Sequence, residues 1–159
     1  MRDMKVSLIT VGTKMPGWVQ EAIKEYQKRI QSELNFSLIE IPLPKRNKSQ
    51  TIQQCIKKEG EQILKMVLPG SRIIALDIAG ISLSTEQLVK KLNIFRAEGQ
   101  NISLLIGGPD GLSQSCLDQS IERWSLSSLT FPHSLVRILV VEQLYRAVSI
   151  LRAHPYHRG

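Results

Sequence analysis

The sequence is poor in cysteine and in aromatic residues. Its two cysteines, Cys55 and Cys116, lie far apart and in neither a metal-binding nor a redox spacing, so we expect both to be reduced packing residues. Aromatic residues make up 5% of the chain, and the core must therefore come mainly from isoleucine, leucine and valine. Such a core is typical of a parallel sheet whose strands are buried on both faces.

Long hydrophobic runs are also absent. No apolar stretch approaches the roughly 18 to 20 residues that a membrane-spanning helix needs. The N-terminus lacks the charged, apolar and small-residue order of a secretory signal. We therefore expect a cytoplasmic protein with no membrane partner.

Motifs for phosphate and metal binding are missing as well. The glycine-rich stretch 107–111 is not a G-x-G-x-x-G fingerprint, and no Lys-Ser or Lys-Thr pair follows it as in a P-loop. Asp77 and Asp110 belong to no compact carboxylate cluster, so we expect no metal. A phosphate-binding α/β enzyme that acts on a small molecule is therefore disfavoured.

What is present is a basic chain of ordinary composition. With 159 residues it is long enough for one core but not for two, so we expect a single domain spanning residues 1–159. The formal net charge is +7, which favours a polyanionic partner such as nucleic acid. The alternative is that the charge serves only solubility.

Strand and helix patterns alternate along the chain. Short β-branched or apolar runs predict strands at 5–11, 36–42, 72–77, 102–106 and 124–129. Apolar residues at helical spacing predict helices at 18–34, 114–121 and about 134–154. Two more are predicted, one from a cap at Ser49 or Thr51 to 67 and one from an N-terminal helix signal at 84–87 to about 99. This alternation predicts an α/β fold with a mostly parallel sheet flanked by helices.

Three loops follow strands and are suited to hold a ligand. In an open α/β sheet, ligands bind beyond the carboxyl ends of the strands. The loops at 76–80 and 107–111 are glycine-containing, and glycine lets a ligand approach the main chain closely. The loop at 128–133 leads into the last helix, which carries Arg137 and Arg146.

Several phrases of the sequence closely resemble one family. They are Val11–Pro16 (VGTKMP), Lys58–Glu61 (KEGE), Leu104–Gly111 (LLIGGPDG), Leu129–Arg137 (LTFPHSLVR), Glu142–Ala147 (EQLYRA) and His154–Arg158 (HPYHR). They are similar to the SPOUT methyltransferases that modify N3 of a pseudouridine in large-subunit ribosomal RNA. The resemblance runs nearly end to end and is most specific in the last third of the chain.

The resemblance implies a SPOUT α/β-knot, in which the C-terminal segment forms a trefoil knot, and a homodimer whose subunits complete each active site. It implies S-adenosyl-L-methionine as cofactor. Matched by motif, the cofactor-binding residues are Leu76, Gly108, Ser127, Ser128, Leu129, Thr130, Phe131 and Pro132. Apolar walls and main-chain hydrogen bonds suit such a pocket.

The C-terminal tail supplies the candidate catalytic residues, which are His157, Tyr156, Arg158 and His154. Methyl transfer to an imide nitrogen needs an acceptor for its proton, and a histidine is our first choice. Arg158 would stabilise the uracil oxyanion or hold a phosphate. The alternative is an ordinary frayed terminus.

Other polar residues leave two interpretations open. His133 either serves the site or bonds a loop carbonyl. Arg137 and Arg146 can be solvated helix charges, but Arg137 lies close to the cofactor loop and is a candidate to meet RNA. Lys45, Arg46 and Lys48 form either a phosphate-contacting loop or a solvated turn.

The leading functional hypothesis is methylation of a pseudouridine in the intersubunit stem-loop of large-subunit rRNA, on the assembled ribosome. This substrate is what the resemblance implies, and the small chain offers little RNA-binding surface beyond one domain. The alternative is a catalytically inactive RNA-binding or ribosome-assembly protein on the same scaffold.

Overall fold

The sheet of this protein has five parallel strands in the order β2-β1-β4-β3-β5. The structure is a computed structural model, and it describes residues 4–31, 33–45, 49–153 and 156. The strands are β1 (Lys5–Val11), β2 (Asn35–Ile41), β3 (Arg72–Ser82), β4 (Ile102–Ile106) and β5 (Glu122–Ser125). The helices are α1 (Gly17–Ile30), α2 (Ile52–Lys65), α3 (Thr85–Ala97), α4 (Gln114–Gln119) and α5 (His133–Leu151). The predicted α/β class with a parallel sheet is confirmed.

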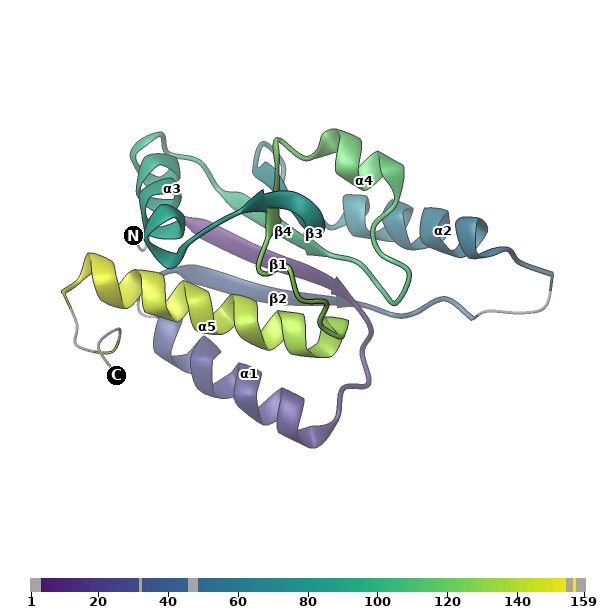
Figure 1. Cartoon of the computed structure of the whole chain (residues 1–159), viewed down its shortest axis with the longest axis horizontal. Coiled ribbons are helices and arrows are strands. Elements are labelled where there is room, and N and C mark those ends of the chain that lie inside the picture. Colours follow the sequence, from purple (N-terminus) through teal and green to yellow (C-terminus); the bar gives the residue numbers. More distant parts are fainter. Residues whose placement is uncertain (1–3, 32, 46–48, 154–155, 157–159) are drawn as a thin grey trace.

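Helices cover both faces of the sheet, as Figure 1 shows. The alternation of side chains along β4 explains why both faces are apolar: Ile102, Leu104 and Ile106 join the core under α1, α3 and α5, whereas Leu105 joins the core under α2 and α4. All five residues of β4 are buried. This central strand is therefore shielded on both sides, as a continuous apolar run predicts.

Local capping signals set where two helices begin. Thr51 caps α2, and its side chain accepts a hydrogen bond from the Gln54 backbone N–H while the Gln54 side chain accepts one from Thr51 N–H. Ser84 and Gln87 form the same reciprocal arrangement at α3. The predicted N-terminal helix signal at 84–87 is confirmed, with Ser84 as the cap, and of the two candidates for α2 the cap is Thr51.

The strands next to the predicted site differ from expectation. β5 begins at Glu122 and ends at Ser125, so the prediction of a strand over 124–129 is wrong for residues 126–129. β3 continues to Ser82, and residues 77–80 are therefore part of that strand instead of a loop after it. The register shifts between Leu76 and Ile81, and both pair with Trp124. An irregularity of this kind is invisible to periodicity, because it depends on the partner strand.

Helix ends also differ from the sequence-based bounds. α1 ends at Ile30, four residues before the predicted end, and α5 ends at Leu151, so the prediction that this helix reaches His154 is wrong. After α5, Ala153 has a φ of 57°, a left-handed conformation that terminates a helix.

Both cysteines are buried and free, as predicted. The Cys116 thiol donates to the carbonyl of Gly60 at 3.7 Å, where α4 crosses α2. Within the part of the chain that the structure describes, no helix is long and apolar enough to cross a membrane.

Candidate active site

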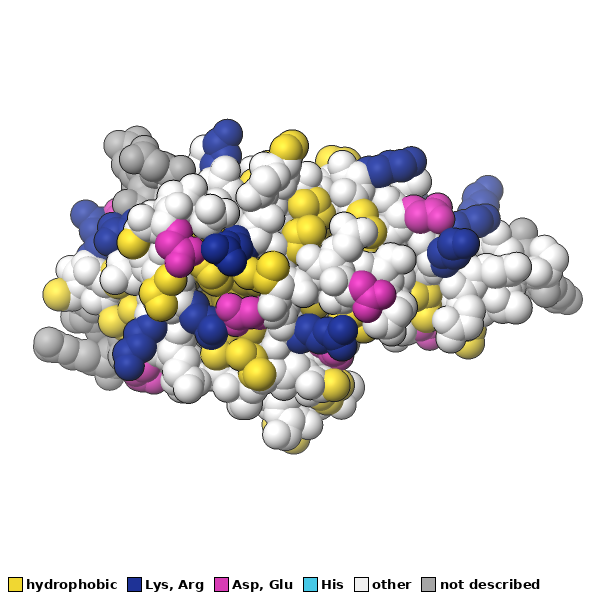
Figure 2. Space-filling model, turned by 90° about the horizontal axis from the view of Figure 1, so that it is seen from above, with side chains coloured by type: hydrophobic (Ala, Val, Ile, Leu, Met, Phe, Trp, Pro, Cys, Tyr) yellow, Lys and Arg dark blue, Asp and Glu magenta, His cyan; other side chains and the backbone are white. Residues whose placement is uncertain are grey.

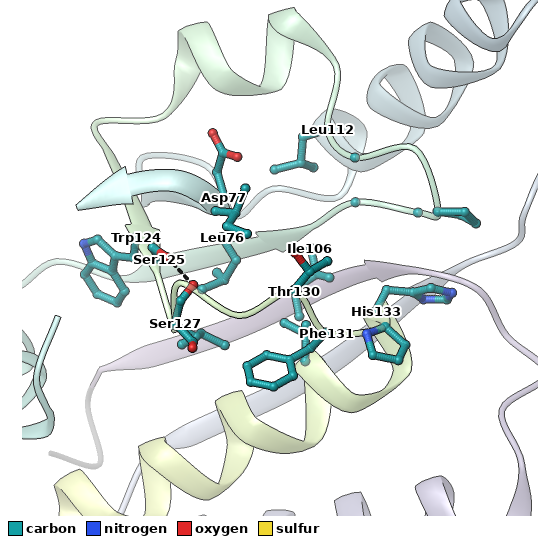
Figure 3. A pocket seen from close by; sticks show the side chains of 18 of the residues that line it. Leu76, Asp77, Ile106, Leu112, Trp124, Ser125, Ser127, Thr130, Phe131 and His133 are labelled. Carbon is teal, nitrogen blue, oxygen red and sulfur yellow. Dashed lines mark hydrogen bonds between the residues drawn. The ribbon is translucent and has the colours of Figure 1, made fainter. Parts of the chain in front are cut away.

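The candidate site is a cavity of about 970 Å³ at the carboxyl edge of the sheet. Its walls come from the middle of β3, the end of β4 with the loop that leads to α4, and the end of β5 with the segment that joins it to α5. Figure 3 shows the side chains of Leu76, Ile106 and Thr130 meeting in it from these elements. A parallel sheet places the carboxyl ends of its strands at one edge, and this explains why distant parts of the sequence share one cavity.

The loop after β4 is tightly folded and needs its glycines. Gly111 donates its N–H to the carbonyl of Gly108 at 3.0 Å and has a φ of 87°. A Cβ on Gly107 would lie 2.4 Å from the carbonyl carbon of Gly111, and one on Gly108 would lie 2.8 Å from Oε1 of the buried Glu59. The loop therefore presents bare main chain to the cavity, where a ligand can approach it.

The segment between β5 and α5 is held by its own serines. Ser125 Oγ donates to the carbonyl of Ser127 at 3.0 Å, and Ser127 Oγ accepts from the N–H of Leu129 at 2.9 Å. Short side-chain to backbone bonds of this kind shape a turn without regular structure. The segment is therefore ordered locally, although its Leu129 side chain is 69% exposed.

The structure brings most of the predicted cofactor residues together. The seven that line the cavity are Leu76, Gly108, Ser127, Leu129, Thr130, Phe131 and Pro132. Ser128, the eighth, is exposed and is not among the lining residues. His133, for which the sequence allows two interpretations, lies on the wall of the cavity.

His133 stands at the side of the cavity opposite Trp124 (Figure 3). Its Nδ1 is buried and has no hydrogen-bond partner within the described part of the chain, so the alternative of a bond to a loop carbonyl is not seen at this atom. Burial, and secondarily the nearby Arg137 guanidinium, lower the pKa of His133 below 6.5. A neutral imidazole at this position can accept a hydrogen bond or a proton.

We expect the His133 imidazole to titrate below pH 6.5 in the folded protein, because its charged form is penalised by burial and by Arg137. The unfolded chain then binds the proton more readily, so stability is retained above pH 6.5 and falls as the pH drops through the pKa of the folded state. NMR titration of the histidine ring protons measures this pKa, and His133→Gln identifies the resonance. A His133 pKa above 6.5 would contradict the prediction.

Arg137 is fully buried, in contrast to the expectation of a solvated or RNA-facing side chain. Its Nη1 contacts Glu40 Oε2 at 2.6 Å, and its Nη2 donates to Thr10 Oγ1 and to the carbonyls of Val11 and Gly12, each at 3.3 Å. Burial of a guanidinium is tolerated only with such partners. Arg137 therefore ties the start of α5 to the ends of β1 and β2.

Tyr156, the only predicted catalytic residue that the structure describes, does not line this cavity. Its ring packs edge-on against Tyr145 with centroids 4.4 Å apart, and its hydroxyl lies 3.4 Å from that of Tyr26 and 3.3 Å from Glu142 Oε1. Burial, the bond to Tyr26 and the Glu142 carboxylate raise its pKa above the ordinary value. Tyr156 is thus held as a neutral phenol between α1 and α5.

The rest of the predicted tail, His154, His157 and Arg158, lies outside the described residues. Arg146 is not a free solvated charge, because it pairs with Glu142 at 2.7 Å and lies over the Tyr156 ring at 5.1 Å. Among residues 4–31, 33–45, 49–153 and 156, no group of three metal-ligating side chains occurs.

Comparison with known proteins identifies the family to which the chain belongs. A family described as "Predicted SPOUT methyltransferase" matches residues 4–157. The chain belongs to the SPOUT methyltransferase family. Its members use a methyl donor, and the position of the cavity at the carboxyl edge of the sheet is compatible with binding one.

Relatives of this SPOUT methyltransferase are similar over their whole length. A protein named ribosomal RNA large subunit methyltransferase H from Saccharophagus degradans is 54% identical over 98% of this chain and 100% of its own. Proteins of the same name from Teredinibacter turnerae and Hahella chejuensis are 51% and 48% identical, with the same 98% of this chain covered and 100% and 99% of their own.

Two solved structures share the fold. A probable methyltransferase from Bordetella pertussis superposes with a TM-score of 0.59 at 12% identity, covering 92% of this chain and 96% of that chain. A probable methylase family protein from Haemophilus influenzae has a TM-score of 0.56 at 13% identity, covering 97% of this chain and 70% of that chain. The trefoil knot itself stays a prediction from the family resemblance.

Proposed function

We propose that this protein transfers the methyl group of S-adenosylmethionine to N3 of a pseudouridine in large-subunit ribosomal RNA. The observation that carries the proposal is the match, over 98% of the chain and at about half identity, to relatives named as large-subunit rRNA methyltransferases. The net charge of +7 supports an RNA substrate. A ribosomal substrate also favours a cytoplasmic location.

The residues of the cavity fit such a cofactor. Leu76, Leu129 and Phe131 supply apolar wall, and the bare main chain at Gly107 and Gly108 allows close approach by a polar ligand. When bound, S-adenosylmethionine supplies an electrophilic methyl group. The cavity walls would hold it, and the serine-braced segment 125–129 is already shaped for that contact.

For the chemistry, N3 of the pseudouridine forms the new bond to the methyl carbon and must lose its proton to a base. We propose that a histidine of the tail, His154 or His157, accepts this proton and that Arg158 stabilises the charge on the uracil oxygen. We also propose that neutral His133 on the cavity wall accepts a hydrogen bond from the cofactor or from the pseudouridine.

We further propose a homodimer in which each tail serves the cavity of the other copy. Tyr156 contacts Tyr145, which lies twelve positions along α5 from His133 at the cavity. Twelve positions correspond to about 18 Å of helix, so Tyr156 is held far from the His133 side of its own cavity. None of the 19 residues of α5 is fully exposed, and a second, mostly apolar hollow of about 370 Å³ lies beside it, lined by residues such as Leu83, Leu126 and Leu139. These features favour a second copy packed against α5.

Light scattering on the purified protein should therefore give a mass of twice the 17.9 kDa of one chain. Mixing a Gly108→Val variant with a tail variant such as His157→Ala should restore activity, because one cavity of the mixed dimer is then intact and is served by an intact tail. A monomeric mass, or no restoration after exchange of subunits is shown, would contradict the dimer.

The function is tested by incubating the protein with methyl-labelled S-adenosylmethionine and ribosomes from a strain that lacks the enzyme. We expect label in large-subunit RNA at one pseudouridine of the intersubunit stem-loop, with assembled ribosomes preferred to free subunits. Mass spectrometry of the RNA identifies the nucleotide. Affinity for ribosomes without cofactor binding by calorimetry would instead support an inactive RNA-binding protein on this scaffold.

A further inference from the structure

One part of the carboxyl edge of the sheet, at the ends of β1 and β2, has no role in the proposed cofactor binding. β1 lies between β2 and β4 in the sheet, so the loop after β1 is next to the cavity loop after β4. A Cβ on Gly12 would lie 3.6 Å from His133 Cε1, and the Gly12 N–H donates to the carbonyl of Ile41 at 2.7 Å. The start of the segment after β1 therefore lies beside His133 at the cavity wall, and it is bonded to the end of β2.

A large aromatic side chain is exposed on this part of the edge. Trp18, in the first turn of α1, is 59% exposed, although its neighbour Val19 is fully buried. The loop before it is held in place because Gln20 Nε2 donates to the carbonyl of Met15 at 2.7 Å. Leu43, after β2, is 46% exposed. The indole is thus presented to solvent by an ordered helix end.

The two segments that leave the sheet carry charge of one sign, whereas on α1 itself the exposed Glu21 lies one turn from Trp18. Lys14 and Lys45 are exposed, and neither segment 12–17 nor segment 42–45 contains an acidic residue. The acidic Glu40 at the end of β2 is engaged by Arg137. In contrast, Figure 2 shows basic and acidic side chains mixed on the face that is seen from above.

An exposed indole with flanking lysines has the chemistry of a single-stranded nucleic-acid platform. Bases stack on aromatic faces, and lysines contact the phosphates of the same strand. In Figure 1 both segments leave the sheet at its right-hand end, away from the N-terminus of the chain. We propose that Lys14, Trp18, Leu43 and Lys45, here called the Trp18 surface, bind the RNA strand beside the methylated nucleotide. This proposal rests on the proposed function.

The test compares four full-length variants in the methylation assay with ribosomes: Trp18→Ala, Lys14→Glu, Lys45→Glu and Lys5→Glu. Lys5 is the matched control, because it is exposed at the opposite end of β1, about 20 Å from the carboxyl edge. We expect Trp18→Ala to raise KM for ribosomes at least about fivefold, with a smaller change in kcat. Lys14→Glu and Lys45→Glu should raise KM and reduce its salt dependence, whereas Lys5→Glu should do neither.

Two outcomes would overturn the proposal. One is an equal effect of Lys5→Glu and Lys14→Glu on KM, which would mean that only the net charge matters. The other is that Trp18→Ala changes the mass measured by light scattering, which would mean that a second copy covers this surface. Failure of the proposed function is distinguishable, because the wild-type protein would then leave ribosomes unmethylated. Calorimetry with S-adenosylmethionine on each variant measures whether cofactor affinity is unchanged, and so distinguishes a loss of RNA binding from damage to the cavity.

Discussion

Replacing Gly108 with valine should weaken S-adenosylmethionine binding at least about a hundredfold while the protein stays folded. A Cβ at this position would lie 2.8 Å from Glu59 Oε1 and 3.4 Å from Val11 Cγ1. Both neighbours come from packed elements, α2 and β1, so the loop must move toward the cavity. The substitution therefore shifts the loop into the space that the cofactor would occupy. Isothermal calorimetry measures the dissociation constant directly.

Gly17→Val is the matched control for this experiment. A Cβ on Gly17 would meet nothing within 4 Å, and Gly17 lies at the start of α1, outside the residues that line the cavity. Circular dichroism and thermal unfolding should be close to wild type for both variants. If Gly108→Val binds the cofactor as tightly as Gly17→Val does, the cavity is not the cofactor site.

Replacing Arg137 with methionine should lower the free energy of unfolding by about 3 to 5 kcal/mol. The variant removes a guanidinium with no exposed surface and leaves the Glu40 carboxylate and the carbonyls of Val11 and Gly12 without their donor. For a chain of this size the midpoint of thermal unfolding should fall by roughly 6 to 20 °C. Differential scanning calorimetry and urea titration measure both quantities.

Arg29→Met is the control for the removal of an arginine. Arg29 also pairs with a glutamate, Glu25 at 2.8 Å, but both side chains are largely solvated, at 39% and 55% exposure. Exposed pairs of this kind contribute about 0 to 1 kcal/mol, and the guanidinium also lies over two tyrosine rings. Equal destabilisation by the two variants would show that burial of Arg137 contributes nothing.

Much of the fold could be predicted from local pattern. The bounds of β1 and β4 match the predicted strands at 5–11 and 102–106, because buried parallel strands are continuous apolar runs between turns. Thr51 and Ser84 start helices through bonds made within four residues of chain. The motif resemblance also named seven residues that the structure places around one cavity.

Other features depend on partners that are remote in the sequence. In the sequence Arg137 is indistinguishable from an exposed basic residue of a helix. Its partners Glu40 and Thr10 lie 97 and 127 positions away, and it becomes buried only when α5 packs against the sheet. The extension of β3 to Ser82 requires β5 beside it, where a Cβ on Gly80 would lie 2.5 Å from the Arg123 carbonyl. Sequence periodicity carries no information on either neighbour.

The sequence by itself determined the class of the fold, the starts of most elements and the family, because these depend on local periodicity, capping and ordered motifs. The tertiary structure decided which residues share a site. It separated Tyr156 from the cavity by a length of α5, left Ser128 off the cavity wall and left Trp18 exposed in the first turn of α1. These placements follow from the order of strands in the sheet, since strand order determines which loops become neighbours at the carboxyl edge.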